Sequence, residues 1–517
     1  MKHIFFIFIF WCSIQNGFSQ ETIFHTNFNN NDDITTIKGI TGKKAFDLTE
    51  NNPHRLALRL PILKKIDTAV TISVWVKSAL ESKEDYVIMS SLKQVLKNFN
   101  GWKFSVQPSG AWKFWVRQDD AFYEFTPTRL QTIRDGNWHL LTVSYAPNKG
   151  NLSFYYDGQL KGIYNVVNIK EAFISDSIMI GNSLDDPHIS RIKDGALSND
   201  SEWSTFYGQI DEIKIFNYAL SPQDIADYYS KITGKKHLLL NYNNILKIMQ
   251  FNIWHGANET GKETGMIRLI KLLKESNADV YTFQETYGSG EKIADALGYN
   301  FYLISTNLSI MSRYPITETF RLYQPFKSGG VQITVPGNRK INVFAVWLSH
   351  LPYYQRDLPQ GKWRSIEDYM VEENDTRGKD IKNIMAGIDS ICQKSPSVPV
   401  IMSGDFNSGS YLDWLKKTEK IHFGYTIKWP ASITAHKSGF KDAYREVNPY
   451  PLKDIGVTWS TIKHGSNPKY QNDRIDYIYY RGKQLRVLNA HVINAGGLVR
   501  FPSDHAAISA LFKWVDE

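Results

Sequence analysis

Residues 398–407, VPVIMSGDFN, decide the fold of the second half of the chain. An apolar run short enough for one buried strand leads directly into Ser403-Gly404-Asp405-Phe406-Asn407. In an extended segment Asp405 and Asn407 point to the same side, so both can meet one phosphate or water. Polar residues follow or end an apolar run at five further places: Gln250-Phe251-Asn252, Phe283-Gln284-Glu285, Leu348-Ser349-His350, Arg474-Ile475-Asp476-Tyr477 and Ser503-Asp504-His505.

The residue types in these motifs suit a divalent cation and a phosphate ester. Hydrolysis of such an ester needs a cation near the phosphate oxygens, an activated water and a group that eases the leaving oxygen out. Glu285 ends a buried run and is a natural Mg²⁺ ligand, because Mg²⁺ prefers carboxylate oxygens and water. Asn252 can hold a metal-bound water or orient that glutamate. The motifs therefore predict a hydrolase.

Two histidines provide candidates for the acid–base chemistry. A histidine acts efficiently as a base when a carboxylate fixes its tautomer, and Asp476 is the candidate partner of His505. Asp504 directly precedes His505 and is suited to metal support. His350 would stabilise the developing charge or protonate the leaving group.

Strands alternate with helices from residue 245 onward. Apolar runs indicate strands at residues 246–253, 280–285, 342–348 and 398–403. Helical spacing of apolar residues indicates helices at residues 265–276, 291–297 and 380–391. This alternation predicts a layered α/β domain.

Residues 21–230 have the pattern of an all-β sandwich. Strand-like runs recur between turn signals at residues 71–76, 112–116, 139–145, 152–156, 177–182 and 208–216. Asp157-Gly158 follows one of these runs, as a hairpin turn would. The first helix signal is Ser221-Pro222, an N-cap followed by proline. We therefore expect a multidomain protein, with a β-sandwich followed by an α/β domain.

The N-terminus is typical of an export signal. Lys2 is followed by a short apolar core at residues 4–12, and small residues precede an expected cut after Ser19. A lipid-modified Cys12 is the alternative, which the bulky Trp11 before it disfavours. We expect a signal peptide at 1–19, a sandwich at 20–232, a linker at 233–244 and the α/β domain at 245–517. The product would be secreted or periplasmic.

Cysteine content and charge agree with an exported enzyme. Cleavage after Ser19 would leave Cys392 alone, so no internal disulfide is expected. No later segment has the apolar length of a membrane helix. Residues 20–236 hold 25 basic and 25 acidic side chains, and residues 237–517 hold 34 and 27. The excess positive charge therefore lies with the motifs, which fits an anionic substrate without indicating nucleic acid in particular.

Taken in order, the six motifs closely resemble those of the endonuclease/exonuclease/phosphatase superfamily. The resemblance covers about residues 245–515 and implies a four-layer α/β sandwich with its site at one edge of the paired sheets. By this resemblance the metal ligands are Asn252, Glu285 and Asp504, and the implied cofactor is Mg²⁺ or Mn²⁺. Asp405 and Asn407 would act on the water and the transition state, the Asp476–His505 pair as the base, and His350 on the phosphate. Segments around these motifs are similar to a secreted bacterial subgroup of undefined substrate.

The first domain resembles the laminin-G-like, concanavalin-type jelly roll. The resemblance is carried by residues 135–139, Tyr156-Asp157-Gly158 and residues 208–216. Many such domains bind calcium or glycans, so a binding or positioning module is implied, and a structural spacer is the alternative. Asp211 is a candidate calcium ligand. Candidate sugar-stacking residues, which would otherwise fill the core, are Trp102, Trp112 and Trp115.

The leading hypothesis is an exported Mg²⁺-dependent phosphoesterase that cleaves a phosphodiester. A nonspecific nuclease and a phosphatase of sugar or inositol phosphates are alternatives within the enzymes. Outside that class, the chain could be a glycan-binding adhesin with a vestigial hydrolase domain. A long polar stretch that could form a substrate loop contains Tyr353, Tyr354, Arg356 and Arg377.

Overall fold

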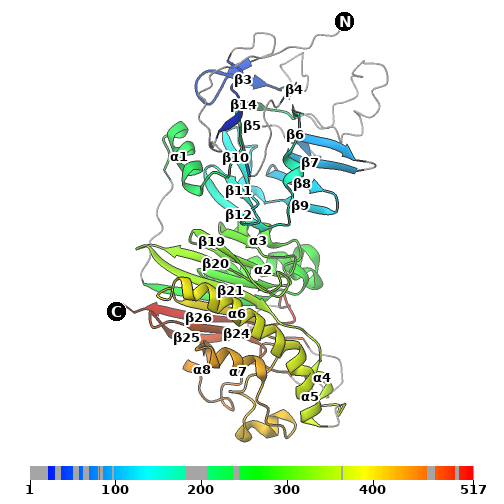
Figure 1. Cartoon of the computed structure of the whole chain (residues 1–517), viewed down its shortest axis with the longest axis vertical. Coiled ribbons are helices and arrows are strands. Elements are labelled where there is room, and N and C mark those ends of the chain that lie inside the picture. Colours follow the sequence, from blue (N-terminus) through cyan, green and yellow to red (C-terminus); the bar gives the residue numbers. More distant parts are fainter. Residues whose placement is uncertain are drawn as a thin grey trace.

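A computed structural model describes most of the chain. It covers residues 21–29, 36–49, 58–61, 69–79, 81, 85–95, 98–181, 206–236, 244–362, 365–462, 472–494 and 500–515. The expected signal peptide and most of the expected linker lie outside these residues. Figure 1 shows the two domains one after the other along the long axis of the molecule. None of the helices in these ranges is long and apolar enough to cross a membrane.

The N-terminal domain is a β-sandwich, as the sequence predicts. One sheet has the order β2-β3-β14-β5-β10-β11-β12, with β1 paired to β14. Its strands are β1 (Thr22–Thr26), β2 (Thr36–Lys38), β3 (Lys44–Asp47), β5 (Val70–Lys77), β10 (His139–Ala146), β11 (Asn151–Tyr156), β12 (Gln159–Asn165) and β14 (Gln209–Phe216). The facing sheet has the order β4-β13-β6-β7-β8-β9. Its strands are β4 (Leu58–Pro61), β6 (Tyr86–Val95), β7 (Asn98–Val106), β8 (Trp112–Gln118), β9 (Ala121–Phe125) and β13 (Ser177–Ile180).

Tryptophans of the sandwich mostly fill its core. Trp102 and Trp112 are fully buried between the sheets, so they are core residues and not a sugar-binding surface. Trp115 lies on the outer face, where the Nζ atom of Lys103 is 5.1 Å from its ring centroid. Short helical turns in the described part of this domain are η1 (Arg129–Gln131) and η2 (Lys170–Phe173).

Local sequence signals of the sandwich have the expected structural effects. Asp157 and Gly158 join β11 to β12 with φ angles of 52° and 78°, the left-handed geometry that a tight hairpin turn requires. Helix α1 (Pro222–Thr233) begins after Ser221, whose hydroxyl accepts the backbone N–H of Asp224 at 3.1 Å. Asp211 accepts the N–H groups of Ile40 and Glu212, and so ties the turn between β2 and β3 to β14. Calcium binding by Asp211 stays a prediction.

The C-terminal domain contains two facing sheets. The first is a continuation of the sandwich sheet beyond β12 and has the order β17-β18-β16-β15-β26-β25. The second has the order β19-β20-β21-β22-β24-β23. The strands of the first are β15 (Ile245–Asn252), β16 (Val280–Gln284), β17 (Asn300–Leu303), β18 (Ser309–Ser312), β25 (Leu485–Ile493) and β26 (Ala507–Trp514). Those of the second are β19 (Ile316–Arg321), β20 (Ser328–Val335), β21 (Arg339–Trp347), β22 (Val400–Asp405), β23 (Lys441–Asp442) and β24 (Asp476–Arg481).

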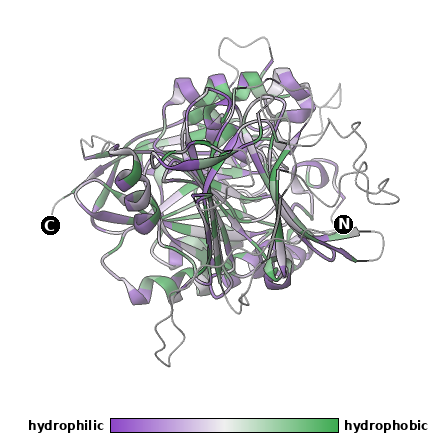
Figure 2. Ribbon diagram, turned by 90° about the horizontal axis from the view of Figure 1, so that it is seen from above, coloured by the Kyte–Doolittle hydropathy of each residue, from purple (hydrophilic) through white to green (hydrophobic). Residues whose placement is uncertain are grey.

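Helices cover the outer faces of both sheets and complete the layered α/β fold. The helices are α2 (Lys262–Ser276), α3 (Gly290–Leu297), α4 (Tyr354–Asp357), α5 (Ile366–Glu373), α6 (Lys379–Lys394), α7 (Pro430–Lys437) and α8 (Ala443–Val447). Shorter or irregular turns are η4 (His255–Thr260), η5 (Asn374–Gly378, a π-helical turn) and η6 (Lys416–His422). Helix α2 packs on the first sheet and α6 and α7 pack on the second. In Figure 2 the outer helices alternate between hydrophilic and hydrophobic residues, as amphipathic surface helices do.

Candidate active site

Side chains that face the opposite sheet change from apolar to polar toward one edge of the domain. Because successive residues of a strand alternate between faces, each series can be followed in steps of two. The series are Leu246, Ile248, Gln250 and Asn252 on β15; Val280, Thr282 and Gln284 on β16; and Ile401, Ser403 and Asp405 on β22. The hydroxyl groups of Thr282 and Ser403 bond at 2.8 Å and link the sheets where this change occurs. The sequence motifs therefore meet at one edge of the inter-sheet layer.

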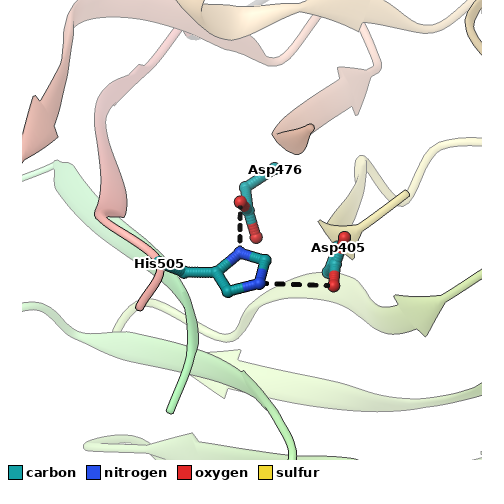
Figure 3. A group of neighbouring side chains, drawn as sticks. All are labelled: Asp405, Asp476 and His505. Atoms are coloured by element: carbon teal, nitrogen blue, oxygen red, sulfur yellow. Dashed lines mark hydrogen bonds and ion pairs between the residues drawn. The ribbon is translucent and has the colours of Figure 1, made fainter. Parts of the chain in front are cut away.

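A buried group of two aspartates and one histidine forms the centre of this edge (Figure 3). Asp476 begins β24 directly opposite Asp405 of β22, and His505 lies two residues before the start of β26. The Nδ1 atom of His505 is 2.9 Å from Oδ2 of Asp476, and its Nε2 atom is 3.9 Å from Oδ2 of Asp405. The structure thus forms the Asp476–His505 pair that the sequence predicts.

Burial changes the protonation of this group. Burial raises the pKa of Asp405 to about 7, although the charge of His505 opposes the change. For His505, burial lowers the pKa, but the charge of Asp476 and the hydrogen bond to it outweigh that effect. With help from Asp504 and Asp405, they raise the pKa of His505 to about 10. Positive charge is therefore favoured at this point of the structure.

Asn252 joins this group to Glu285. Its Nδ2 atom donates to Oε1 of Glu285 and to Oδ2 of Asp405, both at 3.1 Å. Glu285 follows the end of β16 with a left-handed φ of 58°, and its Oε2 atom accepts the N–H of His255. Of the two roles expected for Asn252, the geometry shows orientation of the glutamate.

Asn407 connects Asp405 to the end of the neighbouring strand β21. Its backbone N–H donates to Oδ1 of Asp405 at 2.8 Å, and its Nδ2 atom donates to the carbonyl of Leu348 at 3.0 Å. A left-handed φ of 48° at Asn407 turns the chain so that both bonds form. Asp405 and Asn407 are therefore neighbours, as expected.

His350 lies at the rim of the site and not in its buried centre. Its side chain is exposed, and its ring lies 5.8 Å from that of Trp347. Within the described residues it makes no hydrogen bond to Asp405, Asp476 or His505. His350 is therefore open to solvent, two residues along the chain from the Leu348 carbonyl that Asn407 binds.

The donor set fits a divalent cation. The carboxylates of Asp405, Asp476 and Asp504 act on the buried imidazole of His505, and Asn252 joins Asp405 to the carboxylate of Glu285. Asp504 accepts the indole N–H of Trp459 on Oδ2 at 3.2 Å, whereas its buried Oδ1 atom has no hydrogen-bond partner among the described residues. A buried carboxylate oxygen without a donor is costly unless a cation or another donor meets it. Glu285 and Asp504, with Asn252 beside them, are the residues that would hold such an ion.

Sequence reasoning assigned no role to several residues that support the site. Gln250 donates from Nε2 to Oε1 of Gln284 and to Oδ1 of Asp476, both at 2.7 Å. The hydroxyl of Thr458 accepts the N–H of Asp476. The role of Gln250 could have been inferred, because it lies two residues before Asn252 and so faces the same side of the strand. No comparable signal indicates the hydrogen bonds that Thr458 and Trp459 form with the site.

The expected substrate loop is only partly a surface feature. Tyr354 and Arg377 are completely buried, so the expectation that they contact substrate is wrong. Tyr354 donates to Asp473, and Arg377 pairs with Glu373, four residues before it. Tyr353 and Arg356 are partly exposed, and Tyr353 packs 5.6 Å from Trp459.

Comparisons with known proteins agree with this division of the chain. Residues 56–226 match the concanavalin A-like lectin/glucanases superfamily, and residues 249–505 match the Endonuclease/Exonuclease/phosphatase family. An uncharacterized protein of Caenorhabditis elegans is 28% identical over 299 residues, which are 53% of this chain and 93% of that protein.

Two solved structures of other proteins are similar to about half of this chain. TDP2 of Caenorhabditis elegans has a TM-score of 0.37 at 19% identity and covers 52% of this chain and 98% of its own. The human Nocturnin catalytic domain, solved with a bound sulfate anion, has a TM-score of 0.37 at 15% identity and covers 53% and 97%.

The fold and the site together define a hydrolase of phosphate esters. More closely, the C-terminal domain belongs to the endonuclease/exonuclease/phosphatase family, and the N-terminal domain is a concanavalin A-like sandwich.

Proposed function

We propose that the protein is an exported, divalent-metal-dependent phosphoesterase that hydrolyses a phosphodiester. The observation that carries the proposal is the buried Asp405–Asp476–His505 group, which Asn252 joins to Glu285. Mg²⁺ or Mn²⁺ is the proposed cofactor, held by Glu285, Asp504 and Asn252. The cation would neutralise charge on the phosphate oxygens.

Two histidines would carry out the proton transfers of the hydrolysis. With Nδ1 of His505 bonded to Asp476, Nε2 is the atom that can take a proton from the attacking water when the ring is neutral, and the positive charge of a bound cation would favour that neutral form. The water oxygen then bonds to phosphorus and the bond to the leaving oxygen breaks. Asn252 and Asn407 hold the carboxylate of Asp405 by three hydrogen bonds, so that it faces Nε2 of His505. His350, at the rim, would protonate the leaving group or stabilise its charge.

Export and a diester substrate are proposed from the sequence and the family resemblance. The apolar core after Lys2 supports a secreted or periplasmic location. Two other substrates define the alternatives: nucleic acid, for a nonspecific nuclease, and sugar or inositol phosphates, for a phosphatase. Nuclease activity would fall steeply with salt, whereas phosphatase activity would depend on salt only weakly.

A panel of esters tests the proposal. The full chain would be assayed with Mg²⁺, Mn²⁺ or Ca²⁺ on bis-p-nitrophenyl phosphate, p-nitrophenyl phosphate, plasmid DNA, sphingomyelin and inositol phosphates. We expect turnover of at least one diester, and a loss of about 10²-fold or more in His505→Ala. His491→Ala, on β25 and outside the site, is the matched control and should keep full activity.

The same panel separates the enzyme from an adhesin. A glycan-binding adhesin would bind glycans through its sandwich domain equally well with Asp405→Ala and His505→Ala, and would hydrolyse no ester. Folded protein that is silent on every ester would therefore overturn the proposed activity.

A further inference from the structure

The two domains share one continuous sheet. Strand β12 of the sandwich pairs in parallel with β17 of the C-terminal domain, in the register Gly162–Phe301, Ile163–Tyr302 and Tyr164–Leu303. Strand β17 is also bonded to β18, so it would be an edge strand of its own domain without β12. The rings of Tyr164 and Phe301 lie 6.2 Å apart, and both belong to one hydrophobic core that spans the domains.

Buried and partly buried hydrogen bonds fix the domains to each other beside this strand pair. Asp295 of α3 accepts the backbone N–H and the hydroxyl of Thr128, and also Nε2 of Gln131. On the other side, Asn151 and Thr319 exchange hydrogen bonds of 2.9 and 3.2 Å through their side chains. Such an interface is the opposite of a flexible linkage between independent modules.

The sandwich also holds the turn between β17 and β18, residues 304–308. Nδ2 of Asn165, the last residue of β12, donates to the carbonyl of Ile304 at 2.9 Å. The N–H of Ile304 closes the turn on the carbonyl of Leu308 at 3.0 Å. Gly329 lies so close that a Cβ atom there would be 2.5 Å from Cγ2 of Ile304. The position of this turn is therefore fixed from two sides.

The same turn holds the segment that carries Glu285. Oδ1 of Asn307 accepts the backbone N–H of Glu285 at 2.8 Å, and the carbonyls of Asn307 and Thr306 accept the N–H groups of Thr286 and Tyr287. Glu285 and Tyr287 have φ angles of 58° and 36°, which are unfavourable for residues other than glycine. The three bonds from the turn keep this segment in an unfavourable conformation, which aims Glu285 at Asn252.

We propose that the sandwich domain is a structural part of the active site. Through β12 and Asn165 it fixes the 304–308 turn, and Asn307 of that turn is a positioning residue for Glu285. The inference rests on the proposed function, in which Glu285 holds the cation. In this role the sandwich supports catalysis by positioning Glu285, and it needs no bound ligand to do so.

Two substitutions in the domain interface test the proposal in the full chain. Asn165→Ala removes the bond to the turn, whereas Asn151→Ala removes a similar interdomain bond to Thr319, away from the turn. Hydrogen exchange would be measured for the amides of residues 285–287, and Mn²⁺ binding would be measured without substrate. We expect Asn165→Ala to exchange at least 10-fold faster there and to bind Mn²⁺ several-fold more weakly. Asn151→Ala should match the wild type in both measurements.

Substitution of Asn307 tests the last step. Asn307→Ala removes the acceptor for Glu285 N–H, and Asn307→Asp keeps that acceptor while losing the donor to the carbonyl of Phe326. We expect Asn307→Ala to weaken Mn²⁺ binding and lower kcat at unchanged KM, and Asn307→Asp to restore part of both. Equal effects of Asn165→Ala and Asn151→Ala, or unchanged exchange in both, would overturn the proposal. A wild type that cleaves no ester would refute the proposed function. The exchange measurement would still decide whether the sandwich fixes the segment that carries Glu285.

Discussion

Gln250 donates a 2.7 Å hydrogen bond to Oδ1 of Asp476, the oxygen opposite the one that binds His505. The second hydrogen of the same amide nitrogen is directed to Oε1 of Gln284, also at 2.7 Å. All three side chains are completely buried. The orientation of the carboxylate that fixes the imidazole is therefore set from β15 and β16, on the opposite sheet.

Gln250→Leu should lower kcat because it leaves Oδ1 of Asp476 without its donor. An unpaired buried acceptor costs about 1–3 kcal/mol, so we expect kcat to fall about 10-fold or more at similar KM. The measurement is steady-state kinetics with whichever ester the wild type cleaves, at a temperature where the variant is fully folded.

A matched control separates this effect from loss of stability. Gln332→Leu removes another buried hydrogen bond between two amide side chains. Its partner Asn342 is not part of the site. It should lower Tm by a similar amount and leave kcat unchanged. Equal kcat losses in the two variants would contradict the role of Gln250.

Trp459→Phe should weaken the affinity of the site for its metal. The indole N–H of Trp459 is the donor to Oδ2 of Asp504, whose other oxygen has no hydrogen-bond partner among the described residues. Loss of a group that orients a metal ligand typically costs about 10–100-fold in metal affinity. We expect the Mg²⁺ or Mn²⁺ concentration for half-maximal activity to rise by that factor. Trp514→Phe, at the far end of β26, is the control; an unchanged metal requirement in Trp459→Phe would argue against this role of the indole.

The buried pair of Arg377 and Glu373 supports the loop that carries His350. Arg377 donates to the carbonyls of Ser349 and Pro352, on either side of His350, and pairs with Glu373. Glu373 also accepts the hydroxyl of Ser408, next to Asn407. The π-helical turn at Asn374–Gly378 contains Arg377, and such turns are frequent at functional sites.

Arg377→Met should destabilise the protein by about 3–5 kcal/mol, because Glu373 is left buried and unpaired. The double variant Arg377→Met/Glu373→Met should recover most of this loss. Its kcat should stay low, since the two carbonyls beside His350 no longer have their donor. Chemical denaturation and kinetics on both variants measure the two effects. Full activity in a stable double variant would show that the pair has no part in the site; Lys271→Met, in an exposed pair, should change neither quantity.

The sequence predicts the site wherever the period of a strand decides the direction of a side chain. Asp405 and Asn407 follow from alternation and Asn252 from its place at the end of a strand, and the structure places all three at one edge. The long polar stretch indicates a substrate loop that contains Arg377, and it does not show that a glutamate one turn away will pair with this arginine in the interior. The pairing of β12 with β17 was also missed, since a polar linker between two domains indicates separation and carries no information about edge strands. Arg377 also donates to the carbonyls of Ser349 and Pro352, so contacts between segments far apart in the sequence contribute to its burial as they form the strand pair.

Glu291, in the first turn of α3, lies at the domain interface and should make the free energy of unfolding depend on pH. Its carboxyl accepts the hydroxyl of Thr126 in the sandwich at 3.1 Å, and burial raises its pKa from 4.5 to about 7. A carboxyl whose pKa is raised on folding stabilises the protein while both states are protonated. That contribution is lost as the pH rises from about 4.5 to about 7, because the folded state resists ionisation.

Glu291→Gln should remove this loss. Its free energy of unfolding relative to the wild type should increase by about 3 kcal/mol between pH 4.5 and 7, at about 1.4 kcal/mol per pH unit, and stay level above pH 7. Denaturant unfolding of the full chain at several pH values measures the difference. Glu275→Gln, which removes an exposed carboxyl on α2, should show no such pH dependence. A difference between Glu291→Gln and the wild type that is constant with pH would mean that Glu291 is ionised in the folded interface, held there by Thr126 and the start of α3.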